Sequence, residues 1–174
     1  MTPAAGAGSD RGPRAPGPIY LRVLCFIRDG SRVLLTLRNK APNRGLYNAP
    51  GGKIEPDEDP FDACLREVAE ETGIRLPTAR LRAVLTIITR TTGAHWVLFV
   101  FTAERPPGEP GPIADDEGEL RWVPLAEVAA LPVVSDVPLI LPHLFGPDPG
   151  VLMGKIRCDT DDADSMLEYE FRTG

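Results

Sequence analysis

Three glutamates in the middle of the chain, Glu67, Glu70 and Glu71, stand at positions i, i+3 and i+4. On a helix these positions are neighbours on one face, so their side chains would lie close together. Three like charges side by side repel each other unless something neutralises them. Arg66 is the only cation in this segment, and we expect its side chain to point away from the centre of the carboxylate arc. The simplest alternative is an acidic face that is merely solvated.

The helix that would carry these carboxylates is predicted over residues 59–72. Asp59 is a good N-cap, Pro60 suits the first helical position, and Gly73 supplies the stop. Between them, apolar residues recur at helical spacing and predict one buried face. The carboxylates should therefore lie on a different face from the core contacts.

A carboxylate cluster of this kind suits a hard divalent cation. Magnesium usually takes a few protein carboxylates together with waters and substrate phosphate oxygens. Such a metal screens phosphate charge and lowers the pKa of an attacking water. The preceding Gly51-Gly52 pair adds backbone that can approach a metal or a phosphate closely. The expected cofactor is Mg2+, with Mn2+ as the alternative.

The same residues belong to a longer frame of fixed spacing. Read from the amino end, the frame is Gly52, five residues, Glu58, seven residues, Arg66-Glu67, Val68, one residue, Glu70-Glu71, one residue, Gly73 and Ile74. This frame resembles the signature of the Nudix hydrolase family at every defining position. Because the pattern is long, a chance match is improbable, and the merely solvated face becomes the weaker explanation.

The resemblance implies an α+β fold, an α/β/α sandwich around a mixed β-sheet in which the signature forms a loop–helix–loop. It also implies an enzyme, an acid anhydride hydrolase that cuts a diphosphate linkage attached to another moiety. A nucleoside triphosphate pyrophosphohydrolase would release the monophosphate and pyrophosphate.

Roles carried over from the family fall on matching positions. The catalytic metal ligands would be Glu67, Glu70 and Glu71, completed by the backbone carbonyl of Gly51 or Gly52, while Glu58 and Arg66 would hold the loop and helix in place. The general base stays open among Glu67, Glu71 and an acid from another loop.

That other loop is the Pro/Gly-rich acidic segment 104–119. Family members often recruit a further metal-binding glutamate from a loop after the sheet strands, and Glu117 matches that position. Asp115, Asp116 and Glu119 compete for the role, and a solvated acidic loop is the alternative.

Beyond the signature, residues 19–172 resemble the MutT-type triphosphatases that act on oxidised purines. Asn48 matches a base-reading asparagine, Arg38 a basic pocket residue, and Asp136 an acidic residue that helps to read the purine; Lys53 is a further expected substrate contact. An amide offers donors and an acceptor, which suits a purine edge. Alternatively, Asn48 shapes the turn before a proline, and Asp136 caps the helix that follows it.

Two departures from that group weaken the preference for an 8-oxo purine. Tyr47 stands where a tryptophan is common, and Val133-Val134 stand near the usual place of a base-stacking tryptophan. Tyr47, Phe26 or Trp96 could stack on the base instead, although core packing in a strand is the more economical explanation of Trp96.

The elements around the signature predict one domain over residues 18–174, preceded by a disordered tail at 1–17. We expect hairpins from strands 19–27 and 32–38, 81–90 and 95–103, and 151–158 and 166–172, a short strand over 119–125, a short helix over 126–131, and an apolar helix over 137–145 interrupted by Pro142. This order is that of an α+β or α/β/α sandwich.

Composition narrows the partners and the compartment. A net charge of −6 disfavours a surface built to bind a nucleic-acid polymer. Cys25, Cys64 and Cys158 are scattered and predict buried thiols in a reducing, cytoplasmic compartment rather than a zinc site. No apolar run approaches membrane-spanning length. A monomer or homodimer acting on a small nucleotide is expected.

The function expected from the sequence is Mg2+-dependent hydrolysis of a purine (d)NTP, with 8-oxo-dGTP and nucleotide-pool sanitation, a branch of DNA repair, as the first candidate. A Nudix hydrolase of ADP-ribose, a dinucleoside polyphosphate or pyrimidine nucleotides is one alternative. A nucleotide-binding module without catalysis is the other.

Overall fold

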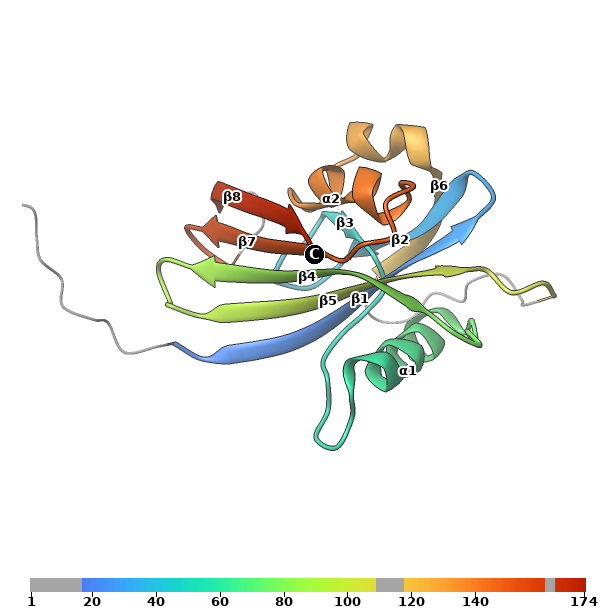
Figure 1. Ribbon diagram of the computed structural model, residues 1–174, viewed down its shortest axis with the longest axis horizontal. Helices are drawn as coiled ribbons and strands as arrows, with labels where there is room; N and C mark the ends of the chain where they lie inside the picture. Colours follow the sequence, from blue (N-terminus) through green and yellow to red (C-terminus); the bar gives the residue numbers. More distant parts are fainter. Residues whose placement is uncertain (1–16, 109–117, 162–164) are drawn as a thin grey trace, which may run out of the picture.

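A computed structural model describes residues 17–108, 118–161 and 165–174 of the chain (Figure 1). Strands β1 (Ile19–Asp29) and β2 (Arg32–Arg38) form the predicted hairpin, with Arg28 opposite Val33. Gly30 makes the turn at a φ of +61°, which glycine adopts readily. The predicted tail at 1–17 lies outside the described residues except for Gly17.

The sheet mixes parallel and antiparallel neighbours. The remaining strands are β3 (Tyr47–Asn48), β4 (Arg80–Thr89), β5 (His95–Glu104), β6 (Gly118–Pro124), β7 (Leu152–Cys158) and β8 (Met166–Thr173). Their order is β3-β2-β1-β5-β4-β7-β8, with β6 paired to β2. Strand β1 runs parallel to β5 and β4 runs parallel to β7, while the other pairs are antiparallel. The predicted mixed sheet is confirmed.

Helix α1 (Pro60–Thr72) covers one face of the sheet (Figure 1). Its ends are those expected, because Asp59 accepts hydrogen bonds from the N–H groups of Phe61 and Asp62, and Gly73 is left-handed with a φ of 72°. The buried side of the helix packs Ala63, Cys64 and Val68 against β1 and neighbouring strands. The carboxylate-bearing side is thereby turned toward the loop that precedes the helix.

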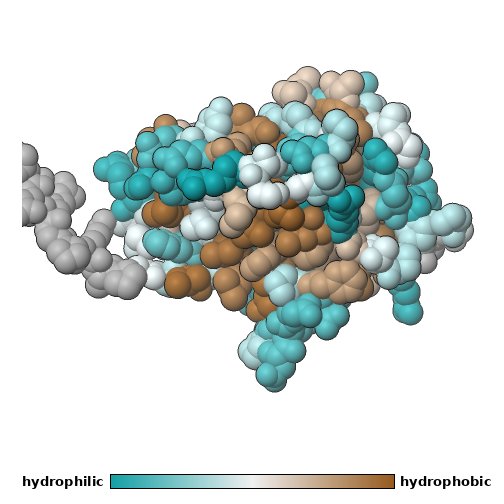
Figure 2. All heavy atoms as spheres, in the orientation of Figure 1, coloured by the Kyte–Doolittle hydropathy of each residue, from teal (hydrophilic) through white to brown (hydrophobic). Residues whose placement is uncertain are grey.

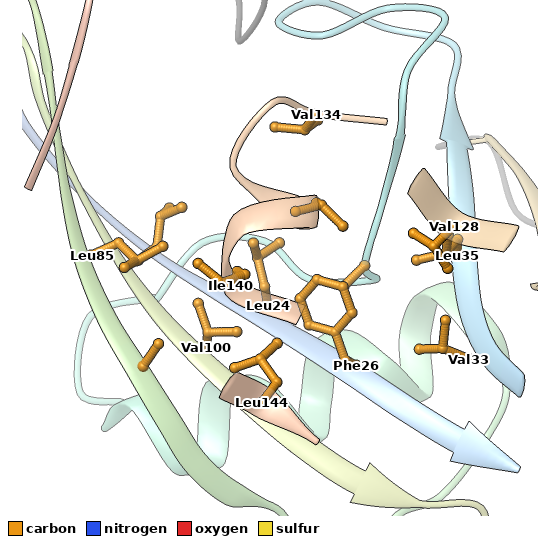
Figure 3. Close-up of a cluster of buried hydrophobic side chains, with 14 of the residues drawn as sticks. Leu24, Phe26, Val33, Leu35, Leu85, Val100, Val128, Val134, Ile140 and Leu144 are labelled. Carbon is orange, nitrogen blue, oxygen red and sulfur yellow. The ribbon is translucent and has the colours of Figure 1, made fainter. Parts of the chain in front are cut away.

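The opposite face of the sheet carries α2 (Val137–Leu144) and the short 3-10 helix η1 (Leu125–Ala130). Ile140 and Leu144 pack onto Phe26, Leu85 and Val100 in the larger core cluster (Figure 3). With α1 below the sheet and α2 above it, the layers are those of an α/β/α sandwich. The predicted fold class is confirmed.

The glycine-containing segment before α1 is joined to β1 by backbone hydrogen bonds. Cys25 N–H donates to the Pro50 carbonyl and Val23 N–H donates to the Gly52 carbonyl, both at 2.9 Å. Ile54 N–H donates to the Leu21 carbonyl at 3.4 Å. These bonds hold the two glycines against β1, where they lie next to the acidic side of α1.

Two details differ from the sequence-based expectation. The helix over 137–144 continues through Pro142, because in a helix of eight residues that proline removes a single intrahelical bond. The helix predicted over 126–131 is a 3-10 helix that begins one residue earlier.

The cysteines and the surface agree with a globular domain. All three cysteines are buried and free. Within the described residues, no helix is both long and apolar enough to cross a bilayer. Figure 2 shows polar side chains around the edges of one face and an apolar area over β4 and β5.

Candidate active site

A pocket of about 570 Å³ brings most of the predicted site residues together. It begins at the glycine segment and the acidic side of α1 and continues over the α2-bearing face of the sheet toward β7. Ten predicted residues line it: Arg38, Asn48, Gly51, Gly52, Lys53, Arg66, Glu67, Glu70, Glu71 and Asp136. Glu58 does not line it, Glu119 lies exposed on β6 outside it, and Glu117, Asp115 and Asp116 fall outside the described residues.

Glu71 is the most enclosed of the three helix carboxylates. Its residue is 8% exposed, and its Oε2 accepts a hydrogen bond from the Gly51 N–H at 2.9 Å. Gly51 has a φ of +151°, and a Cβ at this position would lie 2.1 Å from the Val23 carbonyl oxygen. Glycine is therefore required here both by the backbone conformation and by the space, and its N–H fixes one oxygen of Glu71.

Glu67 lies directly against Gly52. A Cβ on Gly52 would lie 2.4 Å from Glu67 Oε2, so the carboxylate occupies the place where a side chain would otherwise be. Burial raises the pKa of Glu67, while hydrogen bonding and the charge of Arg66 act in the opposite direction. The Gly52 carbonyl is already bonded to Val23 N–H, so Gly51 is the better placed of the two glycines to offer a carbonyl to a metal.

Arg66 does not point away from the carboxylates, and that prediction was wrong. Its guanidinium reaches Glu58 at 2.6 Å, Glu67 at 3.0 Å and Glu70 at 3.0 Å, and also donates to the Lys53 carbonyl at 3.0 Å. A helical wheel places the Cβ atom, whereas a long flexible side chain can return across the helix surface. Hydrogen bonds from Arg66 lower the pKa of Glu58 to about 2.

The oxygen donors suit a divalent cation in kind. Glu67, Glu70 and Glu71 supply carboxylates and Gly51 a carbonyl, the ligand types that magnesium prefers. Across the described ranges, however, no three acidic, histidine or cysteine residues are grouped closely enough to form a metal site. Two of the glutamates, Glu67 and Glu70, are instead paired with Arg66.

Asn48 lies on the other wall of the pocket and is buried. Its Oδ1 accepts from the Ala49 N–H at 2.8 Å, which is the turn-shaping role given above as the alternative. This bond uses one of the two acceptor positions of the amide oxygen and leaves the amide's N–H donors for other partners. Asn48 can therefore shape the turn and still donate hydrogen bonds into the pocket.

Asp136 is 4% exposed and lines the pocket near Val134. The alternative that it caps α2 is wrong, since its backbone is helical, with φ −81° and ψ −23°, and its side chain makes no capping bond. Within the described residues, its Oδ1 has no hydrogen-bond partner. Burial raises the pKa of Asp136 to about 6, although nearby backbone N–H groups favour the charged form.

Trp96 lines the pocket, so the expectation that it is a core residue was wrong. Its indole N–H donates to Asp161 Oδ1 at 3.2 Å, and Thr89 donates to the same oxygen at 2.8 Å. Phe26 and Tyr47 are instead buried in the core, so Trp96 is the one of the three candidate stacking residues that lines the pocket.

Arg22 was not predicted as a site residue. It also lines the pocket, and burial lowers the pKa of its guanidinium while the charge of Glu67 opposes that effect. A signal was present in the sequence, because Arg22 is the only charged residue in the run IYLRVLCFI. A cation in an otherwise apolar strand has to reach water or a ligand.

Comparison with known proteins agrees with this geometry. A family model described as the NUDIX domain matches residues 19–144. The Nudix hydrolase YvcI of Bacillus subtilis is 34% identical over 63% of this chain and 68% of its own length. The 8-oxo-dGDP phosphatase NUDT18 of Mus musculus is 35% identical over 51% of this chain, which spans about a quarter (26%) of that protein.

Solved structures give the same result. The MutT protein of Bacillus halodurans superposes with a TM-score of 0.73 at 29% identity, over 87% of this chain and 97% of its own. The NUDIX domain of Shewanella oneidensis NrtR, solved with ADP-ribose, has a TM-score of 0.61 at 26% identity, over 78% and 92% of the two chains. Because the family model covers most of the described domain, including the glycine segment and α1, the chain belongs to the Nudix family and is a Nudix hydrolase.

Proposed function

We propose that this enzyme hydrolyses a purine nucleoside triphosphate to the monophosphate and pyrophosphate, with 8-oxo-dGTP as its first candidate substrate. The observation that carries the proposal is one continuous pocket with two chemically different ends. Glu67, Glu70 and Glu71 lie at one end, and the buried polar groups of Asn48 and Asp136 at the other. A phosphate chain matches the first end and a purine edge the second.

Nudix hydrolases generally use divalent metal ions such as Mg2+. In this chain Glu67, Glu70, Glu71 and the Gly51 carbonyl would hold the ion, which would supply charge neutralisation and a more acidic water. The protein itself holds Glu71 through the Gly51 N–H and holds Glu67 against Gly52. The base that removes the proton from the attacking water is one of Glu67, Glu71 and an acid of the 104–119 loop, with Glu117 the leading candidate there.

At the base end, Asn48 and Asp136 would read the purine. The Asn48 amide would donate to an acceptor on the base, since its oxygen is already bonded to Ala49. Asp136 Oδ1 would accept from a base N–H, or donate when the carboxyl is protonated. Arg38 and Lys53 line the same pocket and would contact the phosphates. The NUDT18 name supports an oxidised guanine nucleotide as the substrate class.

A second substrate class is favoured by one observation, the ADP-ribose bound to the structurally similar NrtR domain. The catalytically silent alternative has no comparable support, because a pure binding module has little need of three adjacent carboxylates. The buried free thiols support a reducing, cytoplasmic location.

Steady-state kinetics on a substrate panel tests the proposal. The panel contains 8-oxo-dGTP, dGTP, ADP-ribose, a dinucleoside polyphosphate and CTP, each with Mg2+, and products are separated by ion-exchange chromatography. We expect the highest kcat/KM with 8-oxo-dGTP, and monophosphate plus pyrophosphate as products. Asn48→Ala should lower that kcat/KM by roughly 10- to 100-fold, as expected when a buried hydrogen-bonding partner of the substrate is lost. The exposed Asn39→Ala variant is the control.

Other outcomes of the panel are equally decisive. A preference for ADP-ribose would replace the purine-triphosphate assignment with the second class. Absence of turnover on every compound would favour the binding module.

A further inference from the structure

The Arg22 side chain is a half-buried cation that the charge of Glu67 attracts without a direct ion pair in the described residues. It projects from β1 into the pocket, on the strand that neighbours the glycine segment. Over the ranges 17–108, 118–161 and 165–174, its guanidinium has neither an ion-pair partner nor a side-chain hydrogen bond, and it lies over two aromatic rings. Withdrawing a charge from water without pairing it costs free energy, so an anion that enters the pocket gains a strong partner.

A second cation lies directly across from Arg22. Arg22 and Lys53 are partners in an antiparallel bridge, which places the two side chains on the same face, and both line the pocket. Like charges directly opposite each other destabilise a pair of strands. An anion between Arg22 and Lys53 would remove this repulsion.

Two aromatic rings fix the direction of the guanidinium. Arg22 Cζ lies 5.4 Å from the Trp96 ring centroid and 5.9 Å from that of Tyr20, and the two rings are 4.4 Å apart. Trp96 is itself fixed by its bond to Asp161. Stacking on an aromatic face leaves the edge of a guanidinium free to donate hydrogen bonds. The two rings therefore orient the N–H donors of Arg22 and leave them available to a ligand.

We propose that Arg22 is a substrate-binding residue that, with Lys53, binds the phosphate chain of the nucleotide from the β1 side of the pocket, and that Trp96 is its positioning residue. A guanidinium matches phosphate oxygens with paired donors. The identity of the nucleotide rests on the proposed function, whereas the phosphate chemistry of Arg22 does not. The two can therefore be tested separately.

The test is calorimetric titration of the full-length protein with inorganic pyrophosphate, with and without Mg2+. Arg22→Gln should weaken pyrophosphate binding by roughly 10- to 100-fold, the range expected for charge-assisted hydrogen bonds. Arg22→Lys should lose less, because the charge remains. The control is Arg28→Gln on the same strand, since Arg28 also lies over a ring, that of Phe145, but is paired with Glu104 and lies outside the pocket.

Thermal melts establish that each variant is folded. If Arg22→Gln does not fold, pyrophosphate binding by Arg22→Lys tests the assignment instead. Trp96→Leu should weaken pyrophosphate binding several-fold, and Trp96→Phe should restore it, because a ring face is again present under the guanidinium. Loss of binding in both Trp96 variants would overturn the positioning role.

Two results would overturn the assignment of Arg22. One is a wild-type protein that does not bind pyrophosphate. The other is an Arg22→Gln variant that binds pyrophosphate normally. If that variant also binds the nucleoside 8-oxo-deoxyguanosine less tightly, Arg22 lies at the base. If pyrophosphate binding behaves as expected but the nucleotide panel shows no turnover, the proposed function fails and the Arg22 assignment stands.

Discussion

Glu71 and Asp136 are both buried carboxylates in the same pocket, 8% and 4% exposed, yet the protein treats them differently. Glu71 receives a hydrogen bond from the Gly51 N–H, on a glycine segment joined to β1. Asp136 has an oxygen without a partner in the described structure, at the start of α2. One carboxylate is therefore fixed by the backbone, while the other is left to be satisfied by a ligand or a proton.

The difference indicates that the two ends of the pocket have different roles, one in catalysis and the other in recognition of the base. A group that must keep its charge for catalysis benefits from a donor that favours the ionised form. A group that reads a base benefits from unused hydrogen-bonding capacity, because a substrate lacking the complementary group is then rejected.

The largest effect is expected from Glu71→Gln. The amide oxygen can still accept from the Gly51 N–H, so the fold should survive, but the negative charge is lost. We expect kcat to fall by about 10³-fold, as for loss of a central electrostatic group, with the melting temperature nearly unchanged. Steady-state kinetics with Mg2+ would measure this, with the exposed Glu127→Gln as control. Near-normal turnover would remove Glu71 from the catalytic set.

Gly51→Ala should have the next largest effect, on stability. The new Cβ would meet the Val23 carbonyl oxygen at 2.1 Å, at a φ that L-residues rarely adopt. We expect the free energy of unfolding to fall by roughly 4 kcal/mol, the sum of backbone strain and overpacking. Urea titration checks this value. Gly30→Ala, also at positive φ but with open space around it, separates collision from strain and should lose only about 1 kcal/mol.

The third prediction concerns pH and Asp136. Its pKa is about 6 when folded and near the model-peptide value of 3.8 when unfolded, so the folded protein binds the extra proton between these values. The stabilisation is therefore complete below about pH 4 and is lost as the pH rises to about 6. Relative to Asp136→Asn, wild-type stability should fall by roughly 3 kcal/mol between pH 4 and pH 7.

Urea titrations of the two proteins at several pH values measure this difference. The exposed Asp57→Asn variant should show no comparable slope. A wild-type-minus-variant difference that does not change with pH would show that Asp136 titrates normally, and the contrast with Glu71 would then be weaker.

Local sequence signals predicted the parts of the molecule that are determined locally. The α1 caps at Asp59 and Gly73 and the β1–β2 turn depend on residues within a few positions of one another, and the structure places them as expected. The signature also predicted that the helix carboxylates and the glycines lie side by side, and the structure brings them together because α1 and the preceding segment are a single local unit.

The errors concern side chains whose environment is set by distant segments. Trp96 belongs to an apolar strand pattern, and its place in the pocket lining and its bond to Asp161, 65 residues away, are features that this pattern does not encode. Arg66 has the reach to cross its own helix surface, which a helical wheel does not describe. The missing partner of Asp136 likewise depends on how α2 packs against the sheet, and no local pattern encodes that packing.

The hydrogen bonds that join the glycine segment to β1 have a consequence for affinity. Because Val23 and Cys25 donate to Gly52 and Pro50, the segment is held against β1 by backbone hydrogen bonds before any ligand arrives. A nucleotide would thus bind a preorganised surface, and binding would lose little conformational entropy from ordering this segment. Evolution or design could then alter base preference on the α2 and β7 side of the pocket without retuning the phosphate-binding side.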